Sequence, residues 1–352
     1  MLKAFERAHT QPRGAKKISA IVIFCIATMI ASTAQSVHLV ATFDGSNGVQ
    51  PVNLVQGFDG TLYGETTSGG TYNGGSIFQV TPTPSLNSLY SFCAQIVHTC
   101  TDGSTLQGGP LLQTADGDFY GTTGTGGGDG QTNYGTIFRI TLSGHLTTVH
   151  NFAGSPSDGA IPQGLVLGAD GNFYGVTDQG GANCYTCGTF YKATPQGEVS
   201  VLYNFCSLAN CADGSNPLGV TQATNGNFYG TTLLGGTNNL CGTIFQITTT
   251  GQLTTLHNFN QSDGCSPIGP MIQGTDGNFY GTAGGGAHGR GVIFKIDTPG
   301  KFTRVYSFCS QAHCADGVNP SAHHYCRQLT VISMERLRLA ELEWSRQGLS
   351  SG

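Results

Sequence analysis

The hexapeptide 170–175 (DGNFYG) recurs at 276–281. Close variants begin at Asp59 (DGTLYG), Asp116 (DGDFYG) and Asn225 (NGNFYG), so that successive copies start 57, 54, 55 and 51 residues apart. A period near 50 residues is typical of stacked or circularly arranged units, none of which can bury its own apolar face alone. The repeat therefore predicts the architecture before any single residue suggests a function.

Each repeat contains four short apolar stretches. In the third repeat these are 164–167, 172–177, 188–194 and 198–205. They are rich in Phe, Tyr, Thr, Ile and Val, which suit a pleated, half-buried surface, and Gly, Asn, Asp and Pro separate them as turns require. Four strands in about 50 residues is the period of a kelch-like propeller blade. The sequence thus predicts an all-β protein with the fold of a β-propeller.

The ends of the repeat array indicate how a ring of blades would close. The stretch 37–43 (VHLVATF) matches the fourth strand of later repeats, yet it precedes the first complete repeat. We expect it to form the outer strand of the last blade, because closure removes exposed sheet edges. Five full repeats run from about Pro51 to Phe308, and a sixth begins at Asp316. The predicted propeller domain, 35–322, has six blades when intact, and its last blade is disrupted here.

The tail 323–352 departs from the repeat and is expected to be a frameshifted sixth repeat. One permitted set of codons for 323–344, read from its third base, encodes Pro-Leu-Leu-Pro-Ala-Thr-Asp-Gly-Asn-Phe-Tyr-Gly-Thr-Thr. That peptide closely matches 110–123 (PLLQTADGDFYGTT). In the frame as given, 334–346 (MERLRLAELEWSR) has instead the pattern of a charged amphipathic helix, unlike every preceding segment.

The N-terminus has the pattern of an export signal. Basic residues precede an apolar run over 18–30, and the small residues 32–34 precede Gln35. This order predicts a signal peptide over 1–34, cleaved before Gln35. The alternative is an uncleaved membrane anchor, for which the apolar run is short. We expect a secreted or cell-surface protein with no membrane span after cleavage.

Composition excludes some partners. Charged residues make up 10% of the chain, the formal net charge is −5, and no basic stripe occurs. Nucleic acid is therefore not an expected partner.

Three cysteine pairs occupy one repeat position, between the fourth strand and the next Asp-Gly turn. In an exported protein, paired cysteines that close a short loop predict disulfides. These pairs are Cys93 with Cys100, Cys206 with Cys211, and Cys309 with Cys314.

Four further cysteines remain open. Cys184 and Cys187 form a C-x-x-C, but a zinc site needs a second pair or histidines at suitable spacing, and none is nearby in sequence. Structural bridges are favoured, with partners left open among Cys184, Cys187, Cys241 and Cys265.

The repeats also serve as a control for candidate catalytic residues. His150 and His257 occupy the slot that holds Tyr90, Tyr203 and Tyr306 in other repeats. A slot that accepts either residue type indicates packing or hydrogen bonding, rather than a general base or a metal ligand.

The repeated aspartates could form an acidic ring or bind calcium, but Asn225 replaces one of them, and Asp-Gly or Asn-Gly suits a tight hairpin turn. The visible departures from symmetry, His288 with Arg290 and the loop 184–187, form no nucleophile–base set. We predict no catalytic, cofactor or metal-binding residue.

The phrases DGNFYG, GTIFQIT and GQLTTLHNF, recurring in this order, resemble the tandem repeat of the choice-of-anchor GloVer-containing bacterial proteins. The resemblance extends from Val37 to about Pro320. It implies an exported surface protein whose C-terminus carries a sorting or anchoring signal, and it implies no enzymatic role. No such signal is recognisable after Ala322.

These observations favour a binding or structural module outside the cytoplasm, with a surface glycan or a protein as partner. The competing classes are a propeller hydrolase or lyase and a carbohydrate-binding protein that uses the central channel, because the fold alone does not decide function.

Overall fold

Antiparallel strands form five separate sheets in the part of the chain that the structure describes. This computed structural model describes residues 41–320, except Pro84, 96–99, 107, 129–132 and 238–240. These residues belong to one compact unit, Ala41–Gly352, and the other unit, Met1–Val40, lies outside them. The predicted signal peptide over 1–34 and the predicted aberrant tail over 323–352 therefore lie outside the described residues.

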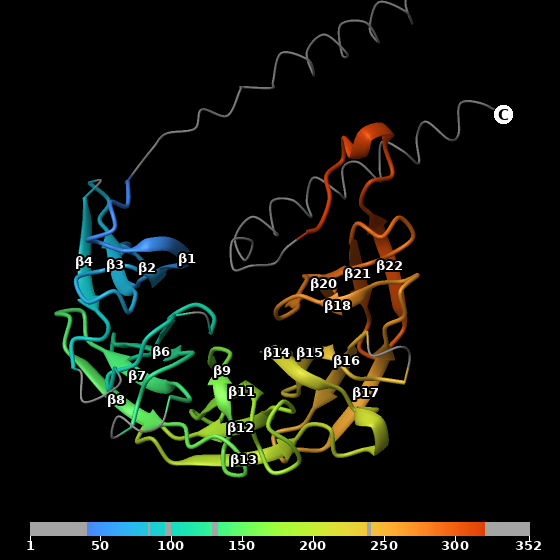
Figure 1. The fold of residues 1–352 in the computed structure, drawn as a ribbon, viewed down its shortest axis with the longest axis horizontal. Helices are drawn as coiled ribbons and strands as arrows, with labels where there is room; N and C mark the ends of the chain where they lie inside the picture. Colours follow the sequence, from blue (N-terminus) through green and yellow to red (C-terminus); the bar gives the residue numbers. More distant parts are fainter. Residues whose placement is uncertain are drawn as a thin grey trace, which may run out of the picture. The chain divides into compact units, whose positions relative to one another are not determined.

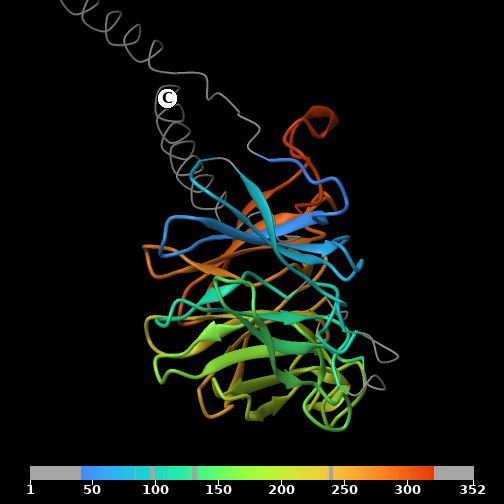
Figure 2. The same ribbon diagram turned by 90° about the vertical axis from the view of Figure 1, so that its left-hand side faces the viewer.

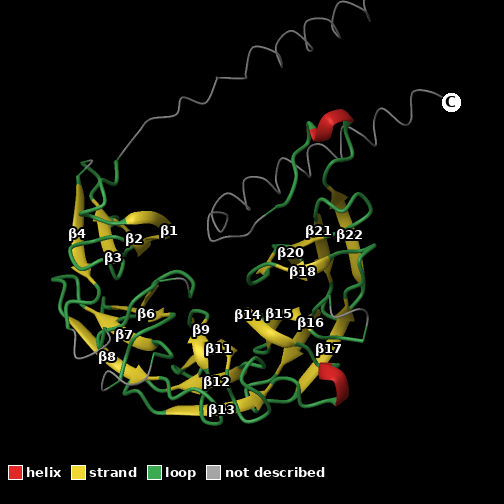
Figure 3. Ribbon diagram, in the orientation of Figure 1, coloured by secondary structure: helices red, strands yellow, loops and turns green. Residues whose placement is uncertain are grey.

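Each sheet is one repeat, and we number them blades 1 to 5 in chain order (Figures 1 and 3). Blade 1 contains β1 (Val49–Gln56), β2 (Leu62–Ser68), β3 (Ser76–Val80) and β4 (Leu86–Ser91). Blade 2 contains β5 (Leu112–Gln113), β6 (Phe119–Thr123), β7 (Thr136–Ile140) and β8 (Leu146–Asn151). Blade 3 contains β9 (Ala160–Pro162), β10 (Val166–Leu167), β11 (Phe173–Gln179), β12 (Thr189–Ala193) and β13 (Val199–Asn204). Blade 4 contains β14 (Ser215–Gln222), β15 (Phe228–Leu234), β16 (Thr243–Ile247) and β17 (Leu253–Asn258). Blade 5 contains β18 (Cys265–Pro267), β19 (Ile272–Gln273), β20 (Phe279–Gly284), β21 (Val292–Ile296) and β22 (Phe302–Ser307).

The glycine of the repeated hexapeptide is required by a close approach between two strands. In blade 4, Gly230 on β15 pairs with Phe245 on β16. A Cβ atom added to Gly230 would lie 2.5 Å from the Phe245 ring, and the corresponding distance at Gly121 is 2.4 Å. Any larger residue would push the aromatic ring out of the core, which explains why Gly recurs after Phe-Tyr.

The aromatic pair of the hexapeptide joins neighbouring blades. The tyrosine of each of the first four copies packs against the phenylalanine of the next copy, with ring centroids 4.2–4.6 Å apart. The four contacts are Tyr63–Phe119, Tyr120–Phe173, Tyr174–Phe228 and Tyr229–Phe279. Four buried apolar clusters lie correspondingly between blades 1 and 2, 2 and 3, 3 and 4, and 4 and 5. Each blade thus buries its face only against a neighbour, as the repeat period predicts.

The all-β propeller fold is confirmed, and the described residues form five blades of antiparallel strands rather than six. Figure 2 turns the first blades toward the viewer. The predicted N-terminal outer strand lies only partly inside the described residues: 37–40 fall outside them, and 41–43 are not in a strand.

Candidate functional site

The repeated Asp-Gly turn leads into the strand that carries the Tyr-Gly of each hexapeptide, namely β2, β6, β11, β15 and β20. Gly60, Gly171 and Gly226 have φ values of 77–82°, in the left-handed region that favours glycine. The side chain before each glycine accepts the backbone N–H two residues later, over 3.0 Å at Asp59, 3.1 Å at Asp170 and 3.0 Å at Asn225. Asparagine performs the same hydrogen bonding as aspartate, so these residues serve the turn.

The second carboxylate oxygen of the turn anchors the tyrosine of the same hexapeptide. Asp170 Oδ2 accepts the Tyr174 hydroxyl at 3.0 Å, and Asp276 Oδ2 accepts the Tyr280 hydroxyl at 2.7 Å. Lys192 Nζ lies 2.9 Å from Asp170 Oδ2. Partial burial alone would raise the pKa of Asp170, but the hydrogen bond from Lys192 holds this pKa well below its ordinary value. The turn carboxylate is therefore neutralised by partners of its own blade.

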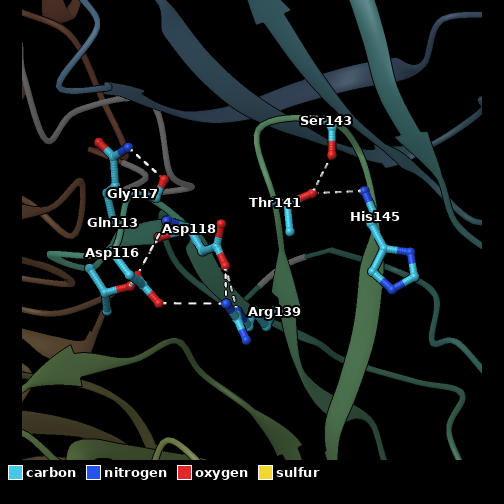
Figure 4. A network of polar contacts seen from close by, with 9 residues as sticks. Gln113, Asp116, Gly117, Asp118, Arg139, Thr141, Ser143 and His145 are labelled. Carbon is cyan, nitrogen blue, oxygen red and sulfur yellow. Dashed lines mark hydrogen bonds and ion pairs between the residues drawn. The ribbon is translucent and has the colours of Figure 1, made fainter.

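In blade 2 an arginine bridges two acidic residues of the turn (Figure 4). Arg139 Nε donates to Asp118 Oδ2 at 2.6 Å, and its guanidinium lies 3.6 Å from Asp116. Gln113 also donates to the carbonyl of Gly117 at 2.9 Å. These contacts give each acidic residue a local partner, which is typical of a stabilised turn rather than of a calcium site.

A second recurrent contact links the end of each outer strand to the following loop, and we call it the outer-strand latch. In it, a tyrosine or histidine contacts an aspartate over 2.6–3.3 Å. Its members are Tyr90–Asp102, His150–Asp158, Tyr203–Asp213, His257–Asp263 and Tyr306–Asp316. Histidine thus takes the place of tyrosine beside the aspartate: His150 makes the hydrogen bond, whereas His257 Nε2 lies 3.3 Å from Asp263 without a hydrogen-bond partner among the described residues.

The latch aspartate also closes its own loop. In blade 3, Asp213 is fully buried and accepts the Tyr203 hydroxyl at 2.7 Å and the backbone N–H groups of Ser207 and Leu208 at 2.9 and 3.1 Å. Burial raises the pKa of Tyr203 to about 12, and burial lowers the pKa of His257. A half-buried histidine beside a carboxylate resembles a catalytic dyad, but the tyrosine members of the latch indicate a structural contact.

Five disulfides lie in the described residues. Three close single loops: Cys93–Cys100, Cys206–Cys211 and Cys309–Cys314. The cysteines left open by sequence pair as Cys184–Cys187 and Cys241–Cys265. Cys241 precedes β16 and Cys265 begins β18, so the last bridge ties blade 4 to blade 5. Several disulfides indicate an oxidising environment outside the cytoplasm.

The asymmetries that the sequence suggested do not form a site with each other. His288 and Arg290 lie on an exposed turn between β20 and β21, and the loop 184–187 lies between β11 and β12 of blade 3.

A different departure from the repeat was not predicted from the sequence. Glu65 is 1% exposed in blade 1, where the equivalent residues of blades 2 and 4 are Thr122 and Thr231. Comparing the residue that directly follows each hexapeptide would have revealed Glu65 as a departure from the repeat.

The recurrent turns, latches and inter-blade aromatic contacts define a class of protein, a β-propeller built from near-identical tandem units. The model of the Gloeobacter/Verrucomicrobia repeat matches residues 22–211 and 128–332. The chain belongs to this family.

Solved structures that are similar in fold share little sequence with this chain. An α-L-arabinofuranosidase of Fusarium graminearum in complex with arabinobiose is 14% identical, with a TM-score of 0.48, over 72% of this chain and 79% of that one. A gluconolactonase from Xanthomonas campestris is 11% identical, with a TM-score of 0.44, over 74% and 76%. Among curated proteins, none matches this sequence. Within the described residues, no helix is long and apolar enough to cross a membrane.

Proposed function

We propose that this protein is an exported binding or structural module without catalytic activity. The observation that carries the proposal is the outer-strand latch, because each histidine–aspartate pair that resembles catalytic machinery has a tyrosine–aspartate counterpart with the same loop-closing contacts. The five disulfides and the N-terminal sequence pattern support export. N-terminal sequencing of exported protein should then begin near Gln35, whereas a start at Met1 in a membrane fraction would indicate an anchor.

Exposed aromatic side chains favour a surface glycan or a protein as the partner. Tyr72 is 51% exposed in the connection between β2 and β3, and Tyr185 is 56% exposed in the equivalent connection of blade 3. Both connections lie at the same end of their blades, because strands alternate in direction within each sheet. Aromatic rings offer large amphipathic contact surfaces.

A glycan array and a cell-surface pull-down would test this partner assignment. The variants Tyr72→Ala and Tyr185→Ala should each weaken binding. Phe58, which is 75% exposed at the opposite end of blade 1, provides the control, since Phe58→Ala should leave binding unchanged. If the wild-type protein turned over a glycan and a variant of a latch histidine lost this activity, the result would instead support the alternative that the protein is a propeller enzyme.

We further infer that the intact propeller has six blades, and the first support comes from the end of the described chain. The N–H of Asn319 donates to the carbonyl of Arg290 at 2.6 Å, and Asn319 has a φ of 48°. The equivalent residue before blade 4, Asn216, donates to the carbonyl of Cys187 at 2.9 Å with a φ of 54°.

The proline that follows occupies a repeated position. A Cβ added to Gly291 would meet the Pro320 ring at 2.1 Å, and one added to Gly188 would meet the Pro217 ring at 2.6 Å. Pro217 is part of β14, the innermost strand of blade 4. By this comparison, the chain at Pro320 enters the innermost strand of a sixth blade.

The second support lies at the other end of the described chain. Asp44 accepts the N–H groups of Ser46 and Asn47 at 3.0 and 3.2 Å, and its own N–H donates to Asn47 Oδ1 at 3.0 Å. The loop that leaves the outer strand of blade 4 repeats this pattern at 260–263. Phe43 also packs on Phe78 with ring centroids 4.9 Å apart, as Phe259 packs on Phe294 at 5.3 Å. The loop 43–48 therefore has the contacts of a segment that follows an outer strand.

The third support is apolar surface on the two terminal blades. Leu54 in blade 1 is 41% exposed, whereas the equivalent Leu111 is 4% and Met271 is 0% exposed. In blade 5, Ile293 and Phe308 are half-buried, although their equivalents in the earlier blades are fully buried. A sixth blade, with the predicted outer strand 37–43, would cover both faces.

A graft tests the sixth blade. Replacing residues 321–352 by a copy of 218–248, the inner strands of blade 4, should raise the melting temperature by at least about 5 °C, since each large apolar side chain that becomes buried contributes about 2 kcal/mol. A Gly/Ser graft of equal length is the control. Leu39→Pro and Val40→Pro should each be introduced into the protein that carries the blade 4 graft. One of these two proline variants should lose the gain in melting temperature, because one of two adjacent N–H groups must face the neighbouring strand. Equal melting temperatures for both grafts would refute the sixth blade.

A further inference from the structure

Four cysteines of blade 3 come together from two different connections. Cys184 and Cys187 lie between β11 and β12, whereas Cys206 and Cys211 lie between β13 and β14. The sulfur atoms of Cys184, Cys187 and Cys206 all lie within 4.8 Å of one another. Cys206 is bonded to Cys211, so a fourth sulfur lies directly beside one member of this group. The second cysteine pair that was absent near the C-x-x-C in sequence is thus present in space.

Hydrogen bonds hold the two connections together independently of the sulfur atoms. Asn183 Nδ2 donates to the carbonyls of Asn204 and Phe205 at 3.1 and 2.9 Å. The N–H of Cys206 donates to the carbonyl of Gly214 at 3.1 Å, and the latch aspartate Asp213 closes the same loop. The two connections are therefore held together by backbone and side-chain contacts that do not involve the sulfur atoms.

Other blades provide a comparison within the same chain. The loops after blades 1 and 5 carry the pairs Cys93–Cys100 and Cys309–Cys314 in the position of Cys206–Cys211. The connections before β3 and β21, at 69–75 and 285–291, contain no cysteine. Only the third repeat places a C-x-x-C beside such a loop, which gives four sulfurs where the loops after blades 1 and 5 offer two.

We propose that, when reduced, this four-cysteine cluster binds one Zn²⁺ ion through thiolates. The spacings C-x₂-C and C-x₄-C fall within the range of structural zinc sites, and a tetrahedral site with Zn–S bonds of about 2.3 Å needs sulfurs about 3.8 Å apart. Cys187 is fully buried, which limits access of water to the ion. Soft thiolates favour Zn²⁺ over Mg²⁺ or Ca²⁺.

Metal and disulfides are alternative cross-links of the same two connections. A dithiol reductant supplies two electrons and two protons to each disulfide and itself becomes a disulfide. Binding of Zn²⁺ by the four resulting thiols then releases their protons to solvent. The corner of blade 3 would stay cross-linked in both redox states, by metal when reduced and by two disulfides when oxidised.

Cobalt substitution tests the site in the full chain, produced in a reducing host compartment and kept with a phosphine reductant. We expect one equivalent of Co²⁺, with a thiolate charge-transfer band and the visible bands of tetrahedral Co²⁺, both displaced by Zn²⁺. The variant Cys184→Ser/Cys187→Ser should lose at least tenfold in affinity. The matched variant Cys309→Ser/Cys314→Ser should bind like the wild type. Equal binding by both variants, or no band in reduced protein whose circular dichroism shows it folded, would overturn the proposal.

A second variant tests the geometry without reduction, in case the reduced chain unfolds. In Cys184→Ser/Cys211→Ser only Cys187 and Cys206 of the cluster remain. Because their sulfurs lie within 4.8 Å, they should form a new Cys187–Cys206 disulfide on oxidation, found by non-reducing peptide mapping. Two free thiols at these positions would show that the four sulfurs do not form one cluster.

Discussion

Asn53 Nδ2 donates to Glu65 Oε2 over 3.1 Å inside blade 1. Both residues are departures from the repeat: Gly219 stands in the slot of Asn53 in blade 4, and Thr231 in the slot of Glu65. In blade 4 that threonine donates to the carbonyl of Gly269 in the next blade at 3.0 Å. Glu65 Oε1 is buried without a hydrogen-bond partner among the described residues. The pair thus replaces a contact between blades by a contact within one blade.

The pH dependence of stability should report on Glu65. Burial raises the pKa of Glu65 from its ordinary 4.5 to about 8, against the opposing effect of the Asn53 hydrogen bond. Between these two values the folded state holds a proton that the unfolded chain has released. The free energy of unfolding should therefore fall as the pH rises from about 4.5 to 8, by up to about 1.4 kcal/mol per pH unit.

Denaturant unfolding of Glu65→Gln should lack this slope, because glutamine does not titrate. Glu198→Gln, at an exposed position, is the matched control and should retain it. The same slope in wild type and Glu65→Gln would show that other groups cause the pH dependence.

The outer-strand latch should be a larger source of stability than the turns. Asp213→Ala removes the buried carboxylate that accepts the Tyr203 hydroxyl and the N–H groups of Ser207 and Leu208. Ser207 and Leu208 are exposed and their N–H groups can turn to water, so the loss comes mainly from the half-buried Tyr203 hydroxyl, and we expect about 1–3 kcal/mol. Tyr203→His, which imitates His150, should cost less than Tyr203→Ala, as measured by thermal unfolding. Equal losses for the two Tyr203 variants would contradict a shared latch.

The aspartate of the repeated turn should be replaceable. Asp170→Asn keeps the hydrogen bond to the backbone two residues later, as Asn225 does in blade 4. It removes the partly exposed ion pair with Lys192, which at the surface is worth at most about 1 kcal/mol. We expect a small change in melting temperature and no change in calcium response or ligand binding. Loss of calcium binding in a folded variant would assign these carboxylates to an ion site after all.

Peptide mapping of exported protein under non-reducing conditions should recover Cys93–Cys100, Cys206–Cys211 and Cys309–Cys314 as pairs within single loops. A bridge that closes so short a loop should stabilise the fold by about 2–3 kcal/mol. The bridge Cys241–Cys265 differs because it joins two blades, so Cys265→Ser should loosen blade 5 in particular. Hydrogen exchange would detect this as faster exchange in β20–β22, and unchanged exchange there would argue against a bridging role.

The sequence predicted the parts of the fold that are local and repeated. Asp-Gly turns and strand stretches follow from residue types within one repeat, and the third repeat's strands lie where the pattern placed them. The proximity of Cys187 to Cys206 was not predictable, because it arises when antiparallel strands bring two separate connections to the same end of a blade. The Asn53–Glu65 pair was visible as two departures from the repeat, but only the structure shows that the two side chains meet.

Resequencing the gene should show that the tail 323–352 is a frameshifted sixth repeat. The spacing in the described chain is compatible with this prediction: the turn residue comes eight positions after Pro217, nine after Pro267 and ten after Leu106, which are the equivalents of Pro320. In the shifted frame the restored aspartate falls where Leu329 and Thr330 meet, also about ten residues after Pro320. A frameshift would remove the inner strands of the sixth blade and leave the exposed Leu54 and the half-buried Ile293 without a covering blade. A frame-corrected protein should therefore unfold at a higher temperature. Codons for 325–343 that do not encode the repeat in the shifted frame would refute the frameshift, and equal stability of the two versions would refute the lost blade.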